Sequence, residues 1–388
     1  MKGMCGKMKR IICFLLAAVM MTCLHTQSAS GEYAPEISAK SAVVIDYLTG
    51  KILFEKNAYE KRPMASTTKI MSALLTAESG GLDERFTVDS EAIKVEGSSM
   101  GLCEGDIVSK RILMYGMLLP SGNDAANAAA VKIAGSKEAF VSLMNKRAAE
   151  LGLDDTHFVT PSGLDDDTDE HYSTAYDMAR LASFALDNGI FREICGVSKA
   201  KLCYGNPPYD RWLTNTNKLL QTLDGVIGVK TGFTDKAGRC LVSACERNGT
   251  TLICVTLNDK NDWADHTALY DSCFGKCESV TLEGLDSELY ADVVGGNEDH
   301  VECYSPKTTV SLPAGEQGNV TRVISLKPFI YAPVSQKEQV GSIRYYYNDK
   351  LIASVPVFTK FSAPALPSNH RSRFDYYLDR IKGFFTAA

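Results

Sequence analysis

The order of strand-type and helix-type segments is the feature that most constrains the fold of this chain. Two short β-type runs, at 41–46 and 51–55, come first, and segments with helical apolar spacing follow as far as residue 187. Three more β-type runs come next, and Asn248-Gly249 between the last two is typical of a tight hairpin turn. Strands on both sides of a helical block predict one mixed sheet with helices packed on it. We expect helices at 66–78, 109–118, 125–134, 137–151, 174–187 and 263–274, and later strands at 226–233, 240–246 and 251–257.

A second domain is predicted from the change of pattern after Lys276. Residues 278–362 alternate short β-type runs, such as Leu289–Val294 and Ser342–Tyr347, with turn residues and show no helical period. The chain of 388 residues is also too long for one ordinary core. We therefore expect two folded domains with a further segment at each end: a signal peptide at 1–30, a first domain at 31–276, a small all-β domain at 277–362, and a linker with a terminal helix at 363–388.

The first 30 residues have the composition of a secretory signal peptide. Four basic residues between Lys2 and Arg10 precede an apolar run from Ile11 to Leu24, and small and polar residues follow. This run is shorter than the roughly 20 apolar residues that span a bilayer. Retention as an uncleaved anchor and lipid attachment at Cys23 are alternative interpretations. We expect an exported, extracytoplasmic protein.

Charge and cysteine content narrow the range of partners. The formal net charge of -6 and the pI of about 5.6 leave no basic surplus to neutralise phosphates, which argues against nucleic acid. The cysteines beyond residue 30 are odd in number and match no known disulfide framework. Cys273 and Cys277 lack a neighbouring His or Cys pair that would complete a zinc site. We expect mostly buried, free thiols, with no metal and no cofactor.

The C-terminal residues have an amphipathic pattern. Two prolines between Ser362 and Ser368 indicate a linker, and charged residues beyond it lie opposite an apolar stripe. One interpretation is a helix docked on its own β domain. The interpretation that we favour is an interfacial helix that anchors the protein to the outer face of the cytoplasmic membrane. The apolar residues at helical spacing are Phe374, Tyr377, Leu378, Ile381 and Phe384.

Ser66 and Lys69 form an S-x-x-K motif at the start of the predicted helix 66–78. A step of three residues places both side chains on the same helix face, so the amine can reach the hydroxyl. A serine hydroxyl becomes a nucleophile when a base takes its proton, and a lysine can be that base only if burial or a nearby cation lowers its pKa. A second copy, Ser198-Lys199-Ala200-Lys201, lies in a polar stretch without an apolar helical face, and we interpret it as a chance match.

Two further motifs lie where a cleft could form. Ser121-Gly122-Asn123 occupies a loop between two predicted helices, and Lys230-Thr231-Gly232 lies in the predicted strand 226–233. A buried, unpaired lysine is costly, which favours a strand edge that lines a cleft, and the glycine would let a substrate backbone approach. Alone, each motif also fits a structural role, as a turn with a helix N-cap or as a surface lysine covering apolar neighbours. Their combination favours an active site.

Together and in this order, the three motifs resemble those of the penicillin-recognising serine enzymes. Within that superfamily the chain is most similar to the low-molecular-mass penicillin-binding proteins of D-alanyl-D-alanine carboxypeptidase type. S-G-L-D at 162–165 and T-A-Y-D-M-A at 174–179 also support this resemblance, which is strong over about 35–275. It implies the α/β (α+β) penicillin-recognising fold and a serine-type carboxypeptidase that acts on the peptidoglycan stem peptide. It also implies inhibition by β-lactams.

The same resemblance implies a role for each catalytic residue. Ser66 would attack the carbonyl between the last two D-alanines, Lys69 would act as the base, and Ser121 would relay the proton to the leaving amine. The backbone N–H groups of Ser66 and Phe233 would bind the oxyanion.

Substrate binding is implied for Asn123, which would hold the substrate amide, and for Lys230 and Thr231, which would bind the terminal carboxylate. Several relatives use an arginine after the last core strand for that carboxylate, but this chain has N-D-W-A-D-H at 261–266. Lys230, Thr231 and Arg239 are the remaining candidates.

Other functions stay open at this point. A class A β-lactamase shares the three motifs and needs a deacylating glutamate, for which Glu170 is the nearest candidate. A D,D-endopeptidase on cross-links uses the same chemistry, and a non-catalytic β-lactam sensor shares the fold. His157, His171 and His266 could suggest a Ser-His arrangement, but we interpret them as structural or surface residues.

Overall fold

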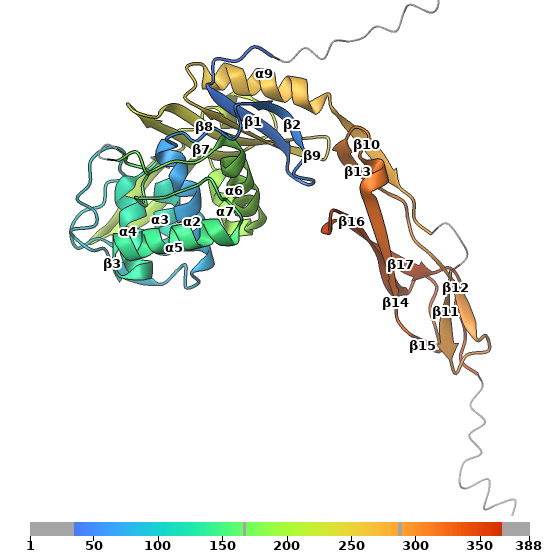
Figure 1. Ribbon diagram of the computed structural model, residues 1–388. Coiled ribbons are helices and arrows are strands. Elements are labelled where there is room, and N and C mark those ends of the chain that lie inside the picture. Colours follow the sequence, from blue (N-terminus) through green and yellow to red (C-terminus); the bar gives the residue numbers. More distant parts are fainter. Residues whose placement is uncertain (1–34, 166–167, 286–288, 367–388) are drawn as a thin grey trace, which may run out of the picture. The chain divides into compact units, whose positions relative to one another are not determined.

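A five-stranded sheet organises the first part of the protein (Figure 1). The computed structural model describes residues 35–165, 168–285 and 289–366. The strands pair antiparallel throughout, in the order β2-β1-β9-β8-β7. β1 and β2 form one hairpin, and β9 returns beside β1. The strands are β1 (Ser41–Asp46), β2 (Ile52–Lys56), β7 (Val226–Thr234), β8 (Gly238–Arg247) and β9 (Thr250–Leu257).

Helices cover both faces of this sheet, with α9 on one face and the helical block on the other (Figure 1). Every residue of β1 is buried, which explains its nearly continuous apolar sequence. Successive side chains of a strand point to opposite faces. Val43 and Ile45 accordingly belong to the core with the helical block, whereas Ala42 and Val44 pack with α9.

The described helices are α2 (Lys69–Glu78), α3 (Lys110–Leu118), α4 (Asn123–Ala134), α5 (Lys137–Glu150), α6 (Ala175–Asp187), α7 (Gly189–Cys195), α8 (Leu219–Thr222) and α9 (Asp262–Phe274). The six that were predicted, α2 to α6 and α9, begin and end close to the predicted positions. The predicted helix 66–78 divides into a 3-10 turn, η1 (Ala65–Thr68), and α2.

Sequence analysis missed α7, the short α8 and two small two-stranded sheets. β3 (Arg85–Thr87) pairs with β4 (Ile107–Ser109), and β5 (Lys199–Gly205) pairs with β6 (Pro208–Thr214). The second S-x-x-K copy therefore lies at the start of a strand and not on a helix, in agreement with its interpretation as a chance match.

The C-terminal part is a separate β domain with its own apolar core. Six of its strands form a sheet in the order β14-β16-β17-β12-β11-β15, and β10 pairs with β13. The predicted strand at Leu289–Val294 is confirmed, and that at Ser342–Tyr347 lies inside β16. The elements are β10 (Cys277–Leu282), β11 (Leu289–Val294), β12 (His300–Tyr304), β13 (Thr308–Pro313), η2 (Gln317–Asn319), β14 (Val320–Leu326), β15 (Ile330–Tyr331), β16 (Gln339–Tyr347) and β17 (Lys350–Thr359).

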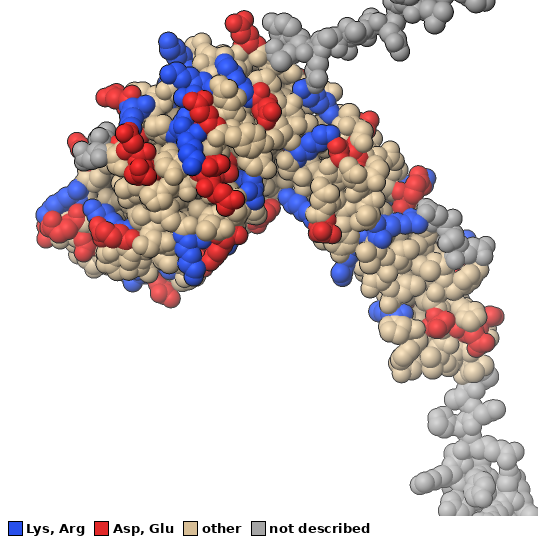
Figure 2. All heavy atoms as spheres, viewed as in Figure 1, with Lys and Arg blue, Asp and Glu red and all other residues tan. Residues whose placement is uncertain are grey.

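The predicted fold class, helices packed on a sheet plus a small all-β domain, is confirmed. The predicted signal peptide at 1–30 and the predicted terminal helix after 366 lie outside the described residues. Within the described ranges, no helix has both the length and the apolar character that a membrane span requires. On the face shown in Figure 2, acidic and basic side chains are interspersed.

Candidate active site

Ser66 lies in the 3-10 turn η1, directly before α2, where the chain meets strand β7. A Cβ atom added to Gly232 of β7 would lie 3.1 Å from the backbone nitrogen of Ser66 and 3.1 Å from the carbonyl oxygen of Met64. We predicted that this glycine would let a substrate backbone approach; in the structure, the backbone of the turn that carries Ser66 lies against it. Ala65, just before Ser66, has a positive φ of 48°, which is uncommon for a residue with a side chain.

Lys69 is fully buried and its amine has three oxygen neighbours. Nζ lies 2.8 Å from Ser66 Oγ, 2.7 Å from Asn123 Oδ1 and 2.6 Å from the carbonyl oxygen of Ser162. Burial lowers the pKa of Lys69 well below its ordinary value, and the ammonium of Lys230 lowers that pKa further, against a smaller effect of Asp124.

The loop Ser121-Gly122-Asn123 brings a second polar group to this amine. Ser121 is buried and has a positive φ of 65°, a strained conformation of the kind that clusters at functional sites. Asn123 is the first residue of α4, and its carboxamide is held at both ends. Its oxygen contacts Lys69 Nζ, and its Nδ2 donates to the carbonyl oxygen of Glu96 at 2.8 Å.

Lys230 and Thr231 occupy neighbouring positions of β7 with different exposure. Lys230 is buried, and its Nζ donates to the backbone oxygen of Thr231 at 2.7 Å. Burial lowers the pKa of Lys230 to about 7. The hydroxyl of Thr231 lies 2.7 Å from that of Thr216, at the surface of the cavity beside Ser66.

A cavity of about 330 Å³ opens at Ser66, between η1, the Ser121 loop and β7. It brings together five of the predicted site residues: Ser66, Ser121, Thr231, Gly232 and Phe233. Lys69, Asn123 and Lys230 do not line it, because they are buried behind its wall. The other lining residues are Ser98, Thr216, Lys218, Arg239, Asp262 and Trp263.

Arg239 places a guanidinium in the wall of this cavity. Its Nη2 donates to both carboxylate oxygens of Asp262, at 2.7 and 2.8 Å, and its guanidinium lies 5.5 Å from the ring centre of Trp263. The Asp262 side chain is only 4% exposed, whereas that of Arg239 is 43% exposed. Asp262 therefore fixes one edge of the guanidinium and leaves the rest of it accessible.

Sequence analysis missed the carbonyl of Ser162 and the hydroxyl of Thr216. S-G-L-D at 162–165 supported the resemblance, but nothing in it indicates which backbone oxygen contacts Lys69. Thr216 follows the unpredicted β5–β6 hairpin, which explains its omission. The nearest available signal was the run T-N-T-N-K at 214–218, whose polar residues follow a strand directly.

None of the three histidines considered above, His157, His171 and His266, contacts Ser66. His171 Nε2 is 2.8 Å from Thr68 Oγ1, and buried His266 lies between Ser243 and Thr256. His157 Nδ1 lies 2.7 Å from the carbonyl oxygen of Glu170. Their interpretation as structural or surface residues is confirmed.

Glu170, the candidate deacylating residue of a β-lactamase, is exposed, and its backbone contacts are with Thr168 and His157.

Cysteine side chains are also placed largely as predicted. Buried free thiols include Cys195, Cys240, Cys245 and Cys254, whereas Cys103 and Cys203 are exposed. Within the described residues, no group of three or more His, Cys, Asp or Glu side chains could hold a metal ion.

A helix-start serine beside a buried lysine of lowered pKa, at a cavity lined by a sheet strand, defines a serine acyl-transfer enzyme of the penicillin-recognising class. Comparison with known sequences then gives the family. The family model described as D-alanyl-D-alanine carboxypeptidase matches residues 27–261, and that described as penicillin-binding protein 5, C-terminal domain, matches residues 280–363. The chain belongs to the D-alanyl-D-alanine carboxypeptidase family, and it is a serine-type hydrolase.

Individual relatives cover most of the chain. D-alanyl-D-alanine carboxypeptidase DacF of Bacillus subtilis is 31% identical over 369 residues, which is 91% of this chain and 94% of the relative. DacC of Escherichia coli is 34% identical over 350 residues, 84% of each chain. Penicillin binding protein 5 from Haemophilus influenzae has a similar structure, with a TM-score of 0.61 and 27% identity over 85% of this chain and 99% of that chain.

Proposed function

We propose that this protein removes the terminal D-alanine from peptidoglycan pentapeptides through an acyl-enzyme on Ser66, and that β-lactams acylate the same serine. The observation that carries the proposal is the position of the fully buried Lys69 amine, 2.8 Å from Ser66 Oγ. Because burial and Lys230 lower its pKa, Lys69 is suited to take the serine proton.

The three neighbours of Lys69 Nζ support its role as a neutral base. A neutral amine has two N–H donors and one lone pair. Asn123 Oδ1 and the Ser162 carbonyl are acceptors only, so they take the two N–H groups. The lone pair is then left for the hydroxyl proton of Ser66. In this arrangement Ser66 attacks the carbonyl of the penultimate D-alanine, and Lys69 receives the proton.

The leaving group and the oxyanion use groups around Ser66. Ser121 lines the same cavity and would relay the proton to the departing amine. The oxyanion would bind to the backbone N–H groups of Ser66 and Phe233, on two elements that approach closely at Gly232. Asn123 would orient Lys69 in the free enzyme; to hold the substrate amide during reaction, its carboxamide would have to exchange one of its present contacts, with Lys69 or with the Glu96 carbonyl, for the substrate. Water then hydrolyses the acyl-enzyme.

For the terminal carboxylate we propose Thr231 and Arg239 as the direct ligands. Both line the cavity of Ser66, whereas Lys230 is buried behind it. The Arg239 guanidinium is held by Asp262 and keeps accessible donors suited to a carboxylate. Lys230 would act through its charge, by lowering the pKa of Lys69.

The cell-wall family implies action outside the cytoplasm. We propose that residues 1–30 direct export and that the amphipathic residues after 368 attach the protein to the outer face of the cytoplasmic membrane. In this proposal residues 31–276 form the catalytic domain, 277–362 form the β domain that positions it, and 363–388 form the linker and anchor.

The test is release of D-alanine from a pentapeptide ending in D-Ala-D-Ala by protein comprising residues 31–388. We expect release by the wild type, loss in Ser66→Ala, and block by penicillin. Ser198→Ala, in the second S-x-x-K copy, is the matched control and should stay active. Penicillin binding at Ser66 without D-alanine release would contradict the carboxypeptidase function and favour cross-link cleavage or β-lactam sensing.

A further inference from the structure

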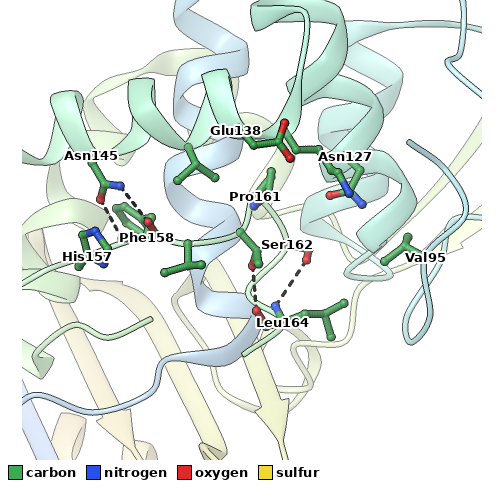
Figure 3. A pocket seen from close by; sticks show the side chains of 13 residues that line it. Val95, Asn127, Glu138, Asn145, His157, Phe158, Pro161, Ser162 and Leu164 are labelled. Carbon is green, nitrogen blue, oxygen red and sulfur yellow. Dashed lines mark hydrogen bonds between the residues drawn. The ribbon is translucent and has the colours of Figure 1, made fainter. Parts of the chain in front are cut away.

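A second cavity lies against the segment 158–164, which includes the Ser162 carbonyl that contacts Lys69 (Figure 3). Its volume is about 440 Å³, within the range of small-molecule sites. α4 and α5 contribute Asn127, Glu138 and Val141 to its wall, and the segment from Phe158 to Leu164 forms the opposite side. It has no lining residue in common with the cavity at Ser66.

Ser162 connects this second cavity to the catalytic amine. Ser162 lines the cavity, while its carbonyl oxygen accepts from Lys69 Nζ at 2.6 Å. The neighbouring carbonyl of Pro161 accepts from Ser72 Oγ on α2, also at 2.6 Å. A molecule in the cavity would therefore contact a segment whose backbone positions Lys69.

Two asparagines in the wall differ in their hydrogen bonding. Both ends of the Asn145 carboxamide are paired: its Oδ1 accepts from the backbone N–H of Phe158 and its Nδ2 donates to the Phe158 carbonyl, both at 2.8 Å (Figure 3). Asn127 is only 5% exposed and lines the cavity, and its side chain makes no hydrogen bond with any residue in the described part of the chain. Its amide is not one of the fully enclosed unpaired groups of the protein, so what remains accessible of it can meet a ligand in the cavity.

The rest of the lining indicates the chemistry of that partner. Val95, Val141, Phe158 and Leu164 supply an apolar wall. The NH2 group and the oxygen of the Asn127 carboxamide can pair with the C=O and the N–H of a peptide group. The adjacent Lys137 and Glu138 are exposed and opposite in charge, which favours a ligand without net charge.

We infer that this cavity binds a neutral peptide group with an aliphatic side chain, paired with Asn127, and that its occupation changes the reactivity of Ser66 through Ser162 and Lys69. The two cavities have no lining residue in common, and the ligand proposed for this cavity is a second molecule, separate from the one being cleaved. The inference rests on the proposed function only for the effect on Ser66, because binding itself requires no catalysis.

Binding is tested by protein NMR on the full mature chain, with N-acetyl-L-leucine N-methylamide as the probe. Ser66 is first acylated with penicillin, and the probe is then added. We expect saturable shifts of the residues around Leu164. The dissociation constant should rise at least tenfold in Asn127→Leu, and binding should be lost in Val141→Trp, which fills the cavity. Absence of saturable binding, equal binding by Asn127→Leu, or binding only before acylation by penicillin would overturn the inference.

Two readouts separate a ligand site from a structural role. Asn127→Leu should keep the melting temperature of the wild type, whereas Asn145→Leu, which breaks two backbone contacts, should lower it. Equal destabilisation by both variants would mean that Asn127 is a structural residue.

Saturating probe should also change the rate of Ser66 acylation by penicillin at least threefold in the wild type and leave it unchanged in Val141→Trp. Binding without that change would contradict the link to Lys69. D-alanine release is measured separately, so failure of the carboxypeptidase function is distinguishable.

Discussion

Replacing Arg239 by glutamine should reduce the enzyme's preference for a free terminal carboxylate. A hydrogen bond to a charged group contributes about 1.5–3 kcal/mol. The Arg239 side chain is 43% exposed, so solvent screening places its contribution near the lower end of that range. A loss of about 1.5 kcal/mol corresponds to a roughly tenfold lower kcat/KM. We expect this loss for peptides ending in D-Ala-D-Ala as the free acid, measured as released D-alanine.

The matching peptide with a C-terminal amide tests the reasoning, because it cannot form the ion pair. Its kcat/KM should be nearly the same in Arg239→Gln and in the wild type. Arg247→Gln is the matched control: Arg247 lies on the same strand and also pairs with an aspartate, Asp271, but it does not line the cavity. Equal losses on acid and amide, or no loss on the acid, would refute the assignment of Arg239 to the carboxylate.

Three more predictions concern Lys69 and the buried core. Burial has the larger effect on the pKa of Lys69, and Lys230→Met removes the charge that lowers this pKa further, so the pKa of Lys69 should rise. The acid limb of the pH profile for acylation by penicillin should therefore move to higher pH, and an unchanged limb would contradict this prediction. Gly163→Ala should slow acylation at least tenfold, because the added Cβ would lie 2.1 Å from a backbone oxygen of the nucleophile turn. Gly135→Ala is the control, because Gly135 has a similar positive φ (83° against 91°) and no atom within 4 Å of the added Cβ; it should be acylated at the wild-type rate. Equal acylation rates of Gly163→Ala and Gly135→Ala would count against a role for this segment. Burial lowers the pKa of His266 to about 3, so the neutral side chain stabilises the folded state fully above the ordinary pKa of 6.5, and this stabilisation is lost as the pH falls towards 3. The free energy of unfolding, measured with urea, should change less with pH in His266→Gln than in the wild type, by about 1.4 kcal/mol per pH unit between pH 6 and 4. An identical slope in the two proteins would contradict this prediction.

Much of the fold could be predicted because the apolar pattern of each long element is set by its packing. β1 matches its predicted range because both of its faces are covered, which makes the run S-A-V-V-I-D continuous. The β5–β6 hairpin could not be predicted in the same way. In β5, Ala200, Leu202 and Tyr204 alternate with exposed residues over only a short stretch, and β6 is mostly exposed, so the apolar pattern that marks this hairpin is weak.

The site was only partly accessible to sequence reasoning, for a related physical reason. Side-chain motifs identified Lys69 together with Ser66 and Asn123, whose side chains contact the Lys69 amine in the structure. The third contact of that amine, the Ser162 carbonyl, is a backbone group that any residue type could provide. The ion pair of Arg239 with Asp262 joins residues on two elements, and its geometry depends on how α9 packs beside β8.

The most direct test of the central claim is to locate the covalent bond formed by penicillin. Mature protein is treated with labelled penicillin, digested, and analysed by mass spectrometry. We expect a single acylated serine, Ser66, with labelling abolished in Ser66→Ala and strongly slowed in Lys69→Met. Label on Ser198 or Ser121, or undiminished labelling of the Ser66→Ala variant, would contradict the assignment of Ser66 as the nucleophile.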